Sequence, residues 1–181
     1  MDFDSVVKKR TSVKNFSSKK PAPEKIVELI EVANLAPTPG NLHIIHYIMA
    51  EESALIAKIA ELCHQSFIRT APYVVVICTN PKQARRMYDK RADKYVKHHV
   101  GAAIENFLLK VIDGGLASSL VGTFNESLLK ELLGIPEDNE IEAVLPVGYE
   151  LIKGKTKPTE KQSLVTRLSF NNWGNRFYKP I

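Results

Sequence analysis

The chain has 181 residues, of which 44% are hydrophobic and 25% charged, with a formal net charge of +5. This is an ordinary composition for one globular domain with a sizeable core. No apolar run approaches bilayer-spanning length, and the acidic start lacks the order of a secretion signal. With only Cys63 and Cys78, both in apolar surroundings, a disulfide framework is not expected and a reducing cytoplasm is expected.

The first half of the chain alternates helical and strand patterns. Pro23 suits a first helical position, and Pro39-Gly40-Asn41 is strong turn chemistry. The β-branched run Tyr73–Cys78 is typical of a strand buried on both faces. In order, we predict a helix over 3–10, a helix beginning at Pro23, a turn at 39–41, a strand over 44–49, a helix over 51–65 and a strand over 73–78.

The second half continues the alternation and ends in an aromatic tail. Residues 81–97 are polar, basic and helical in character, and a long helix over 100–112 follows and stops at Gly114. Asn125 is a candidate N-cap for a helix closed by Gly134. We predict a strand over 116–121, that capped helix, a strand over 141–149, a linker over 153–162 and a tail over 164–181. Helices mixed with about four strands predict a single α+β domain.

The helix over 100–112 is apolar around most of its circumference. Asn106, Lys110 and Asp113 share one narrow side, and nearly every other residue is apolar. A surface helix normally shows one apolar stripe, so we expect burial on several sides. The helix either lies in the core or packs one flank on a second subunit.

Sequence motifs for several kinds of chemistry are absent. There is no GxGxxG, P-loop or GxSxG pattern, which argues against Rossmann, P-loop and common hydrolase sites. The histidines, His43, His46, His64, His98 and His99, lack acidic or cysteine partners at ligand spacing. We therefore expect no metal site and read each histidine as a satisfied polar residue.

The basic stretch over 82–97 carries seven lysines and arginines interleaved with Tyr88 and Tyr95. A nucleic-acid surface can have this composition. However, Asp89 and Asp93 dilute the charge, and Lys90 and Lys94 can pair with them along the helix. A solvated helix is the favoured interpretation, so nucleic acid is an unexpected partner.

The first loop is the best candidate for binding an anion. Arg10, Ser12 and Lys14 alternate along it, so an extended backbone would send all three to one side. Two cations with a hydroxyl between them can hold a phosphate with charge to spare.

Taken together, these segments resemble the FMN-dependent nitroreductase family. The resemblance lies in the opening KRTSVKNF, in the loop Ala36–His43, and in Ala71-Pro72 before a valine-rich strand. It continues in Gly101–Gly122, Leu132–Pro136, Pro146–Tyr149 and Ser169–Trp173. Seven motifs in the right order cover essentially the whole chain.

The resemblance implies a central, mostly antiparallel sheet flanked by helices in an intertwined homodimer. One domain would span residues 1–181, with 164–181 as a C-terminal arm embracing the partner subunit. Two tightly bound FMN cofactors would lie at the dimer interface, and NAD(P)H would be the co-substrate.

The same resemblance implies roles for individual residues at the cofactor. Arg10, Thr11, Ser12 and Lys14 would bind FMN, with Lys14 near the pyrimidine edge of the flavin. Leu120, Val121, Gly122 and Thr123 would pass the ring, with a backbone N–H facing flavin N5. Thr38, Pro39 and Asn41 would come from the partner subunit, and Lys161 falls at a phosphate-binding position. No side-chain acid or base is required.

The implied activity is ping-pong transfer of hydride from NAD(P)H through FMN to a small acceptor such as a nitro compound or quinone. The alternatives are a relative with a dedicated metabolite substrate, or a non-enzymatic binder of flavin, nucleic acid or a partner protein through residues 82–97. Three departures affect substrate choice more than FMN binding. His43-Ile44-Ile45 replaces the common Gln-Pro-Trp, Thr11 replaces an arginine, and Thr38 replaces a serine.

Overall fold

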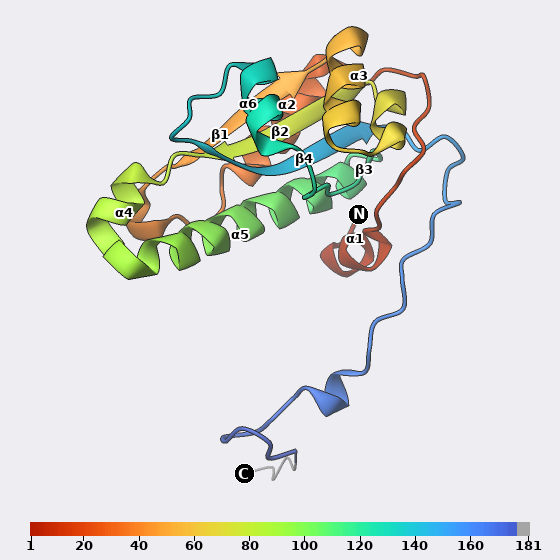
Figure 1. Ribbon diagram of the computed structural model, residues 1–181. Helices are drawn as coiled ribbons and strands as arrows, with labels where there is room; N and C mark the ends of the chain where they lie inside the picture. The colour runs from red at the N-terminus through yellow and green to blue at the C-terminus, as the bar shows by residue number, and fades with distance from the viewer. Residues whose placement is uncertain (177–181) are drawn as a thin grey trace.

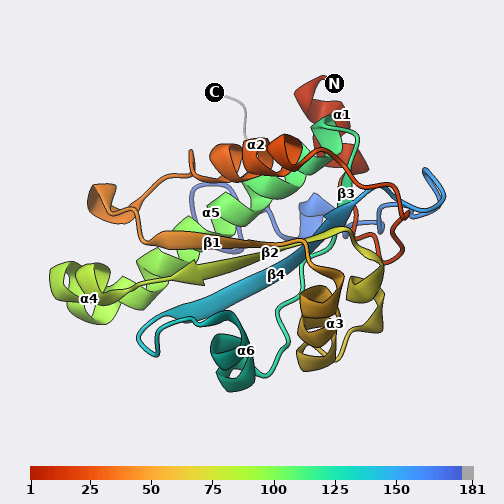
Figure 2. The same ribbon diagram turned by 90° about the horizontal axis from the view of Figure 1, so that it is seen from above.

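The computed structural model describes residues 1–176 and shows helices on both faces of one central sheet (Figure 1). Seen from above, α2 and α5 cover one face, and α3 and α6 cover the other (Figure 2). The architecture is the α+β sandwich predicted from the sequence.

The elements follow the predicted order. The strands are β1 (Ile45–Ala50), β2 (Tyr73–Thr79), β3 (Ala117–Ser118) and β4 (Glu140–Gly148). The α-helices are α1 (Phe3–Lys9), α2 (Pro23–Ala33), α3 (Ser53–Leu62), α4 (Lys82–Tyr88), α5 (Ala92–Asp113) and α6 (Glu126–Leu133). Short 3₁₀ helices are η1 (Pro39–Asn41), η2 (Ser66–Thr70), η3 (Asp89–Arg91) and η4 (Leu164–Thr166).

The sheet has the order β1-β2-β4-β3, and each neighbouring pair is antiparallel. Strand β2 lies in the interior of the sheet and every one of its residues is buried, as its apolar run predicted. The strand expected over 116–121 is shorter than predicted. It leaves the ladder after Ser118 and rejoins it only at Val121, which bridges Val144. The carbonyl of Ser118 instead accepts from the N–H of Val13 at 2.9 Å.

Alternating residues of the strands build two separate cores. Val75 and Ile77 of β2 pack with α2 and α5, whereas Val74 and Val76 pack with α3 and α6. Successive side chains of a strand point to opposite faces, so one continuous apolar strand supplies both cores.

Helix α5 is buried on one broad side rather than on several sides. Its fully buried residues lie on the half that faces the sheet, while Lys97, Gly101 and Glu105 on the outer half are exposed. Leu109 and Ile112 are only half-buried. Within one chain the sheet side covers one broad half of the helix, and Leu109 and Ile112 are the apolar residues that a second subunit would cover.

The chain from residue 151 to 176 forms an arm that runs away from the layered body (Figure 1). Nearly all of its residues are exposed, including Trp173 at 101% of its reference area. This exposed segment contains residues 164–176 of the arm predicted over 164–181. The last residues of the predicted arm, 177–181, lie outside the described residues.

Candidate functional site

The loop after α1 is extended and presents its polar residues on one side. Val13 is 2% exposed and its N–H donates to Ser118 O, which fixes the loop beside β3. Ser12 and Lys14, its two neighbours, are exposed. The alternation predicted for Arg10, Ser12 and Lys14 is therefore compatible with this backbone, because Val13 occupies the inward side.

Two residues of this loop already have partners within the chain. Arg10 Nε lies 3.7 Å from Glu105 Oε1 on the outer half of α5. Thr11 Oγ1 donates to Lys157 O at 3.3 Å, which ties the loop to the start of the arm. An exposed ion pair of this length contributes about 0–1 kcal/mol, so Glu105 holds Arg10 only weakly.

Lys14 lines a small cavity of about 140 Å³ together with Leu120, Val121, Gly122 and Thr123. The backbone of Val121 is occupied, because its N–H and carbonyl both pair with Val144 at 3.0 and 2.9 Å. Within residues 1–176, the N–H groups of Gly122 and Thr123 donate to no protein acceptor. The cavity thus brings one cation and two free backbone donors together.

Ser118, beside this loop, buries a polar atom without satisfying it. The residue is 1% exposed, and its Oγ has no hydrogen-bond partner among the described residues. Leaving a buried hydroxyl unpaired costs about 1–3 kcal/mol. The Ser118 hydroxyl is therefore an energetic cost of the strand that holds the first loop.

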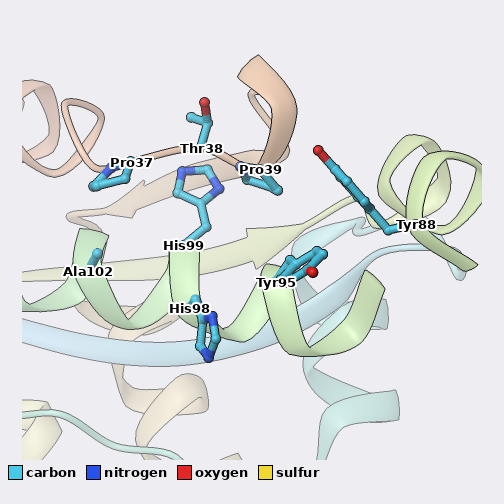
Figure 3. A pocket seen from close by; sticks show the side chains of 8 residues that line it. All are labelled: Pro37, Thr38, Pro39, Tyr88, Tyr95, His98, His99 and Ala102. Atoms are coloured by element: carbon cyan, nitrogen blue, oxygen red, sulfur yellow. The ribbon is translucent and has the colours of Figure 1, made fainter. Parts of the chain in front are cut away.

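Thr38 and Pro39 lie in a second, larger cavity of about 540 Å³. The lining residues are Pro37, Thr38, Pro39, Tyr88, Tyr95, His98, His99 and Ala102 (Figure 3). The rings of Tyr88 and Tyr95 meet edge to face, with centroids 5.0 Å apart. The wall is therefore largely apolar and aromatic.

The turn beside this cavity depends on glycine. Gly40 has φ +56°, and a Cβ at this position would run into the hydroxyl of Tyr88 and the sulfur of Met87. Asn41 follows at φ +60° and is exposed at the end of η1. Asparagine tolerates this left-handed region better than most residues, which accounts for the Gly-Asn pair.

His99 contradicts the expectation that each histidine is satisfied. It is 4% exposed, and its Nδ1 has no partner among residues 1–176. Figure 3 shows its ring directed toward Thr38 and Pro39, whereas the ring of His98 points to the other side of α5. Burial, with a smaller effect from nearby His43, lowers the pKa of His99 below its usual value. Burial therefore disfavours the charged form of this imidazole.

Sequence reasoning missed His99, Tyr88 and Tyr95 as one group, although a signal was present. Tyr95 and His99 are four residues apart and lie on one side of α5, whereas Tyr88 ends the separate helix α4. The sequence analysis noted Tyr88 and Tyr95 within the basic stretch over 82–97 but did not connect them with His99, which lies just beyond it.

The predicted cofactor residues do not line one cavity. The cavity at Thr38 and Pro39 shares no lining residue with the cavity at Lys14. The first lies by the N-terminal turns of α5 and the second by β3, which follows the C-terminal end of α5 (Figure 1). A helix of 22 residues is about 33 Å long at about 1.5 Å per residue. Lys161 lies on the exposed arm, apart from both cavities.

The basic stretch over 82–97 pairs differently from the prediction. Asp93 pairs with Arg85 at 3.2 Å rather than with a lysine along the helix. Arg85 also reaches Glu140, and Lys97 reaches Glu140 and Glu142 near the start of β4. These cations therefore help to fasten α4 and α5 to the sheet, which weakens the alternative of a nucleic-acid surface.

Other site types find little support in the described chain. No group of three or more His, Cys, Asp or Glu residues there is arranged to hold a metal ion. None of its helices combines the length and apolar character that crossing a membrane requires. Cys63 and Cys78 are both buried and unpaired, and burial raises the pKa of each thiol to about 11.

Several known proteins are similar to this chain in sequence or in fold. A protein of Archaeoglobus fulgidus, provisionally named NADH dehydrogenase/NAD(P)H nitroreductase, is 29% identical over 145 residues, covering 77% of this chain and 80% of its own length. The crystal structure of a nitroreductase family protein from Clostridium novyi NT is 26% identical with a TM-score of 0.76, covering 97% of this chain and 96% of that one. The NADPH:FMN oxidoreductase of Vibrio harveyi shares the fold, with a TM-score of 0.81 at 16% identity, over 100% of this chain and 80% of that one.

The model of the nitroreductase family matches residues 7–70 and 61–149. These ranges include the loop at Arg10–Lys14, the turn at Pro39–Asn41 and the segment Leu120–Thr123. The chain belongs to the nitroreductase family.

Proposed function

We propose that this chain, an NAD(P)H-dependent flavin oxidoreductase, works as a homodimer that binds FMN tightly and reduces a small acceptor such as a nitro compound or a quinone. The observation that carries the proposal is the cavity that joins Lys14 to the free N–H groups of Gly122 and Thr123. When bound, FMN supplies the redox chemistry by accepting hydride from NAD(P)H and passing it to the acceptor.

The residues around the first loop fit the chemistry of this cofactor. Arg10 and Ser12 offer a guanidinium and a hydroxyl for a phosphate, and a bidentate guanidinium suits that group well. Lys161, on the arm, would contribute a further cation to the phosphate, and Thr11 would contact the cofactor from within the same loop.

The remaining groups act at the ring. Lys14 lines the cavity and would place a positive charge beside a bound flavin, where it would favour the reduced, negatively charged form. The N–H groups of Gly122 and Thr123 offer donors that need no reorganisation, because the bridge at Val121 fixes the backbone just before them. Leu120 and Val121 line the cavity and would give the ring apolar contact. Hydride transfer by a flavin would require no acid or base from the chain.

The division of the predicted residues between two cavities supports a dimeric site. Thr38, Pro39 and Asn41 lie on the part of the chain away from Lys14 and Gly122. In a twofold dimer each chain can offer its turn over 37–41 to the cofactor held by the other chain. The exposed arm over 151–176 is a second feature that fits a dimer.

A spectrum of the purified protein tests the proposal directly. We expect a yellow protein that releases flavin on denaturation, and the flavin should bleach on anaerobic addition of NADH or NADPH. A colourless protein that does not take up added FMN would overturn the proposal.

Replacing Arg10 by alanine should weaken FMN binding by about 1.5–3 kcal/mol, the range for a hydrogen bond to a charged group. The fold should be little affected, because the Arg10–Glu105 pair is partly exposed. Titration of the apo-protein with FMN measures the effect. Lys8→Ala removes an equal charge from an exposed position of α1 and should leave the dissociation constant unchanged. Equal affinities for the two variants would remove Arg10 from the phosphate site.

A further inference from the structure

The charged end of Lys14 has one partner within the described chain, and that partner is an aromatic ring. Its Nζ stands over the ring of Phe67, 5.7 Å from the ring centroid. Residues 1–176 offer this ammonium neither a carboxylate nor a hydrogen-bond acceptor. An ammonium within about 6 Å of a ring centroid is attracted by the negative face of the ring. The ring is therefore the contact that favours one position of this exposed, flexible side chain.

The ring of Phe67 is itself held in place by packing. Phe67 belongs to η2, is half-buried, and packs against a small cluster of buried residues, Val13, Phe16, Ala71 and Ala117. Val13 directly precedes Lys14 in the chain. One apolar cluster therefore seats both the backbone that carries the lysine and the ring that lies under its side chain.

A hydroxyl group also fastens η2 to the first loop. Thr70 Oγ1 donates to Phe67 O at 2.8 Å and accepts from the N–H of Phe16 at 3.2 Å. Thr70 thus connects the residue that carries the ring with the loop just after Lys14. A lysine side chain has many rotamers, so a partner that is fixed beforehand decides where the charge resides.

Phe67 and Lys14 line the same cavity of about 140 Å³, together with Gly122 and Thr123. We propose that Phe67 is a positioning residue for Lys14, and that its ring keeps the ammonium at this cavity and so raises the reduction potential of bound FMN. The inference rests on the proposed function, which assigns the cavity to the flavin. A positive charge fixed beside the reduced, negatively charged ring stabilises it more than a charge free to move into solvent.

Anaerobic redox titration of the FMN-loaded protein tests the inference apart from turnover. Phe67 is replaced in turn by phenylalanines that carry one, two and three ring fluorines, which weaken the negative face of the ring and change its shape little. We expect the reduction potential to fall with each fluorine. Phe67→Leu removes the ring and should shift the balance toward oxidised FMN about two- to five-fold, the factor for a cation–π contact at an exposed site. This factor corresponds to about 10–20 mV for a two-electron couple.

Further variants separate the effect on Lys14 from other effects of the ring. Lys14→Gln removes the charge itself and should lower the potential more than Phe67→Leu does. In the Lys14→Gln background the fluorine series should have no effect, because the two residues act as one unit. Lys19→Gln is the matched control: Lys19 stands 5.0 Å from the centroid of the Tyr149 ring and does not line this cavity. This control should leave the potential unchanged.

The outcomes distinguish this inference from the function on which it rests. A yellow, NAD(P)H-reducible protein whose potential stays constant across the fluorine series, or in Lys14→Gln, would overturn the inference alone. A fluorine effect that persists in the Lys14→Gln background would do the same, because the ring would then act without the lysine. Failure to bind FMN, read from the flavin spectrum of the same preparations, would instead overturn the proposed function.

Discussion

Ser118 and His99 each bury a polar atom without a hydrogen-bond partner in residues 1–176. At about 1–3 kcal/mol each, such atoms are costly relative to the few kcal/mol by which a domain is stable. One lies beside the predicted phosphate loop and the other on the wall of the aromatic cavity. Each of these unpaired atoms lowers the stability of the folded chain unless a hydrogen-bond partner reaches it. Tyr47 Oη is also unsatisfied, and nothing in its surroundings explains it.

The two cysteines make stability depend on pH in the alkaline range. Cys63 and Cys78 are 0% and 1% exposed, and burial raises the pKa of each thiol from 9.0 to about 11. Between these values the unfolded chain has released the thiol protons and the folded chain has kept them. Stability is therefore complete below about pH 9 and falls as the pH rises toward 11, by up to about 1.4 kcal/mol per pH unit for each thiol.

Urea unfolding at a series of pH values from 8 to 11 measures this dependence. The double variant Cys63→Ala, Cys78→Ala should be less stable at pH 8 and should show a shallower decline above pH 9. Lysines titrate in both proteins, so the difference between the two slopes isolates the thiols. Parallel slopes would show that the thiols do not titrate in this window.

At the scale of elements, helix α6 shows how local signals fix both ends of a helix. Asn125 Oδ1 accepts from the N–H of Leu128 at 3.2 Å, and Gly134 follows the last turn at φ +64°. The N–H of Asn125 also donates to Leu62 O at 2.8 Å, which joins the start of α6 to the end of α3. The cap therefore sets the length of α6 and its position over the sheet.

Asn125→Ala should lower the free energy of unfolding by about 1 kcal/mol, because it removes the acceptor for an N–H of the first turn. The matched control is Ser127→Ala, at an exposed position in the same turn, which should change stability by less than about 0.5 kcal/mol. Chemical denaturation of both variants gives the comparison. Equal losses would mean that the cap contributes nothing beyond helix propensity.

Elements with local signals were predictable from sequence, and elements defined by distant partners were not. The capped α6 and the β-branched run of β2 were found because their signals lie within a few residues. The strand at 116–121 was overestimated because its end depends on Val13, about a hundred residues away, which occupies the Ser118 carbonyl. The exposure of the outer half of α5 could not be predicted for the same reason, because it depends on which distant elements pack against the helix.

In the candidate site, too, features with local sequence signals could be predicted, and features that depend on distant residues could not. The alternation at Arg10, Ser12 and Lys14 follows from local pattern, and its assignment to FMN came from family resemblance. That Lys14 meets the free donors of Gly122 and Thr123 depends on the pairing of Val121 with Val144. The pocket at His99 requires α5, α4 and the turn over 37–41 to come together, which no local motif encodes.

At the scale of the whole molecule, the chain is a layered body with an uncovered arm (Figure 1). Leu164 and Val165 of η4 are 63% and 73% exposed, and Trp173 is fully exposed. By contrast, the outer half of α5 carries Lys97, Gly101 and Glu105, so it offers less apolar area to a partner than the sequence suggested. The arm therefore becomes the stronger argument for a dimer.

Truncation after Gln162 should dissociate the dimer and reduce flavin retention, because it removes the exposed apolar residues of the arm. A buried tryptophan contributes about 150–250 Å² of contact, worth about 4–6 kcal/mol at about 25 cal/mol per Å² before the costs of association. Trp173→Ala in the full chain should therefore weaken the dimer by about 2 kcal/mol or more. It should leave the stability of each separate chain unchanged, because Trp173 is fully exposed within one chain. Sedimentation and the flavin-to-protein ratio measure both effects, with Ser163→Ala as a control on the same arm. A truncated protein that stays dimeric and yellow would show that the arm does not embrace the partner subunit.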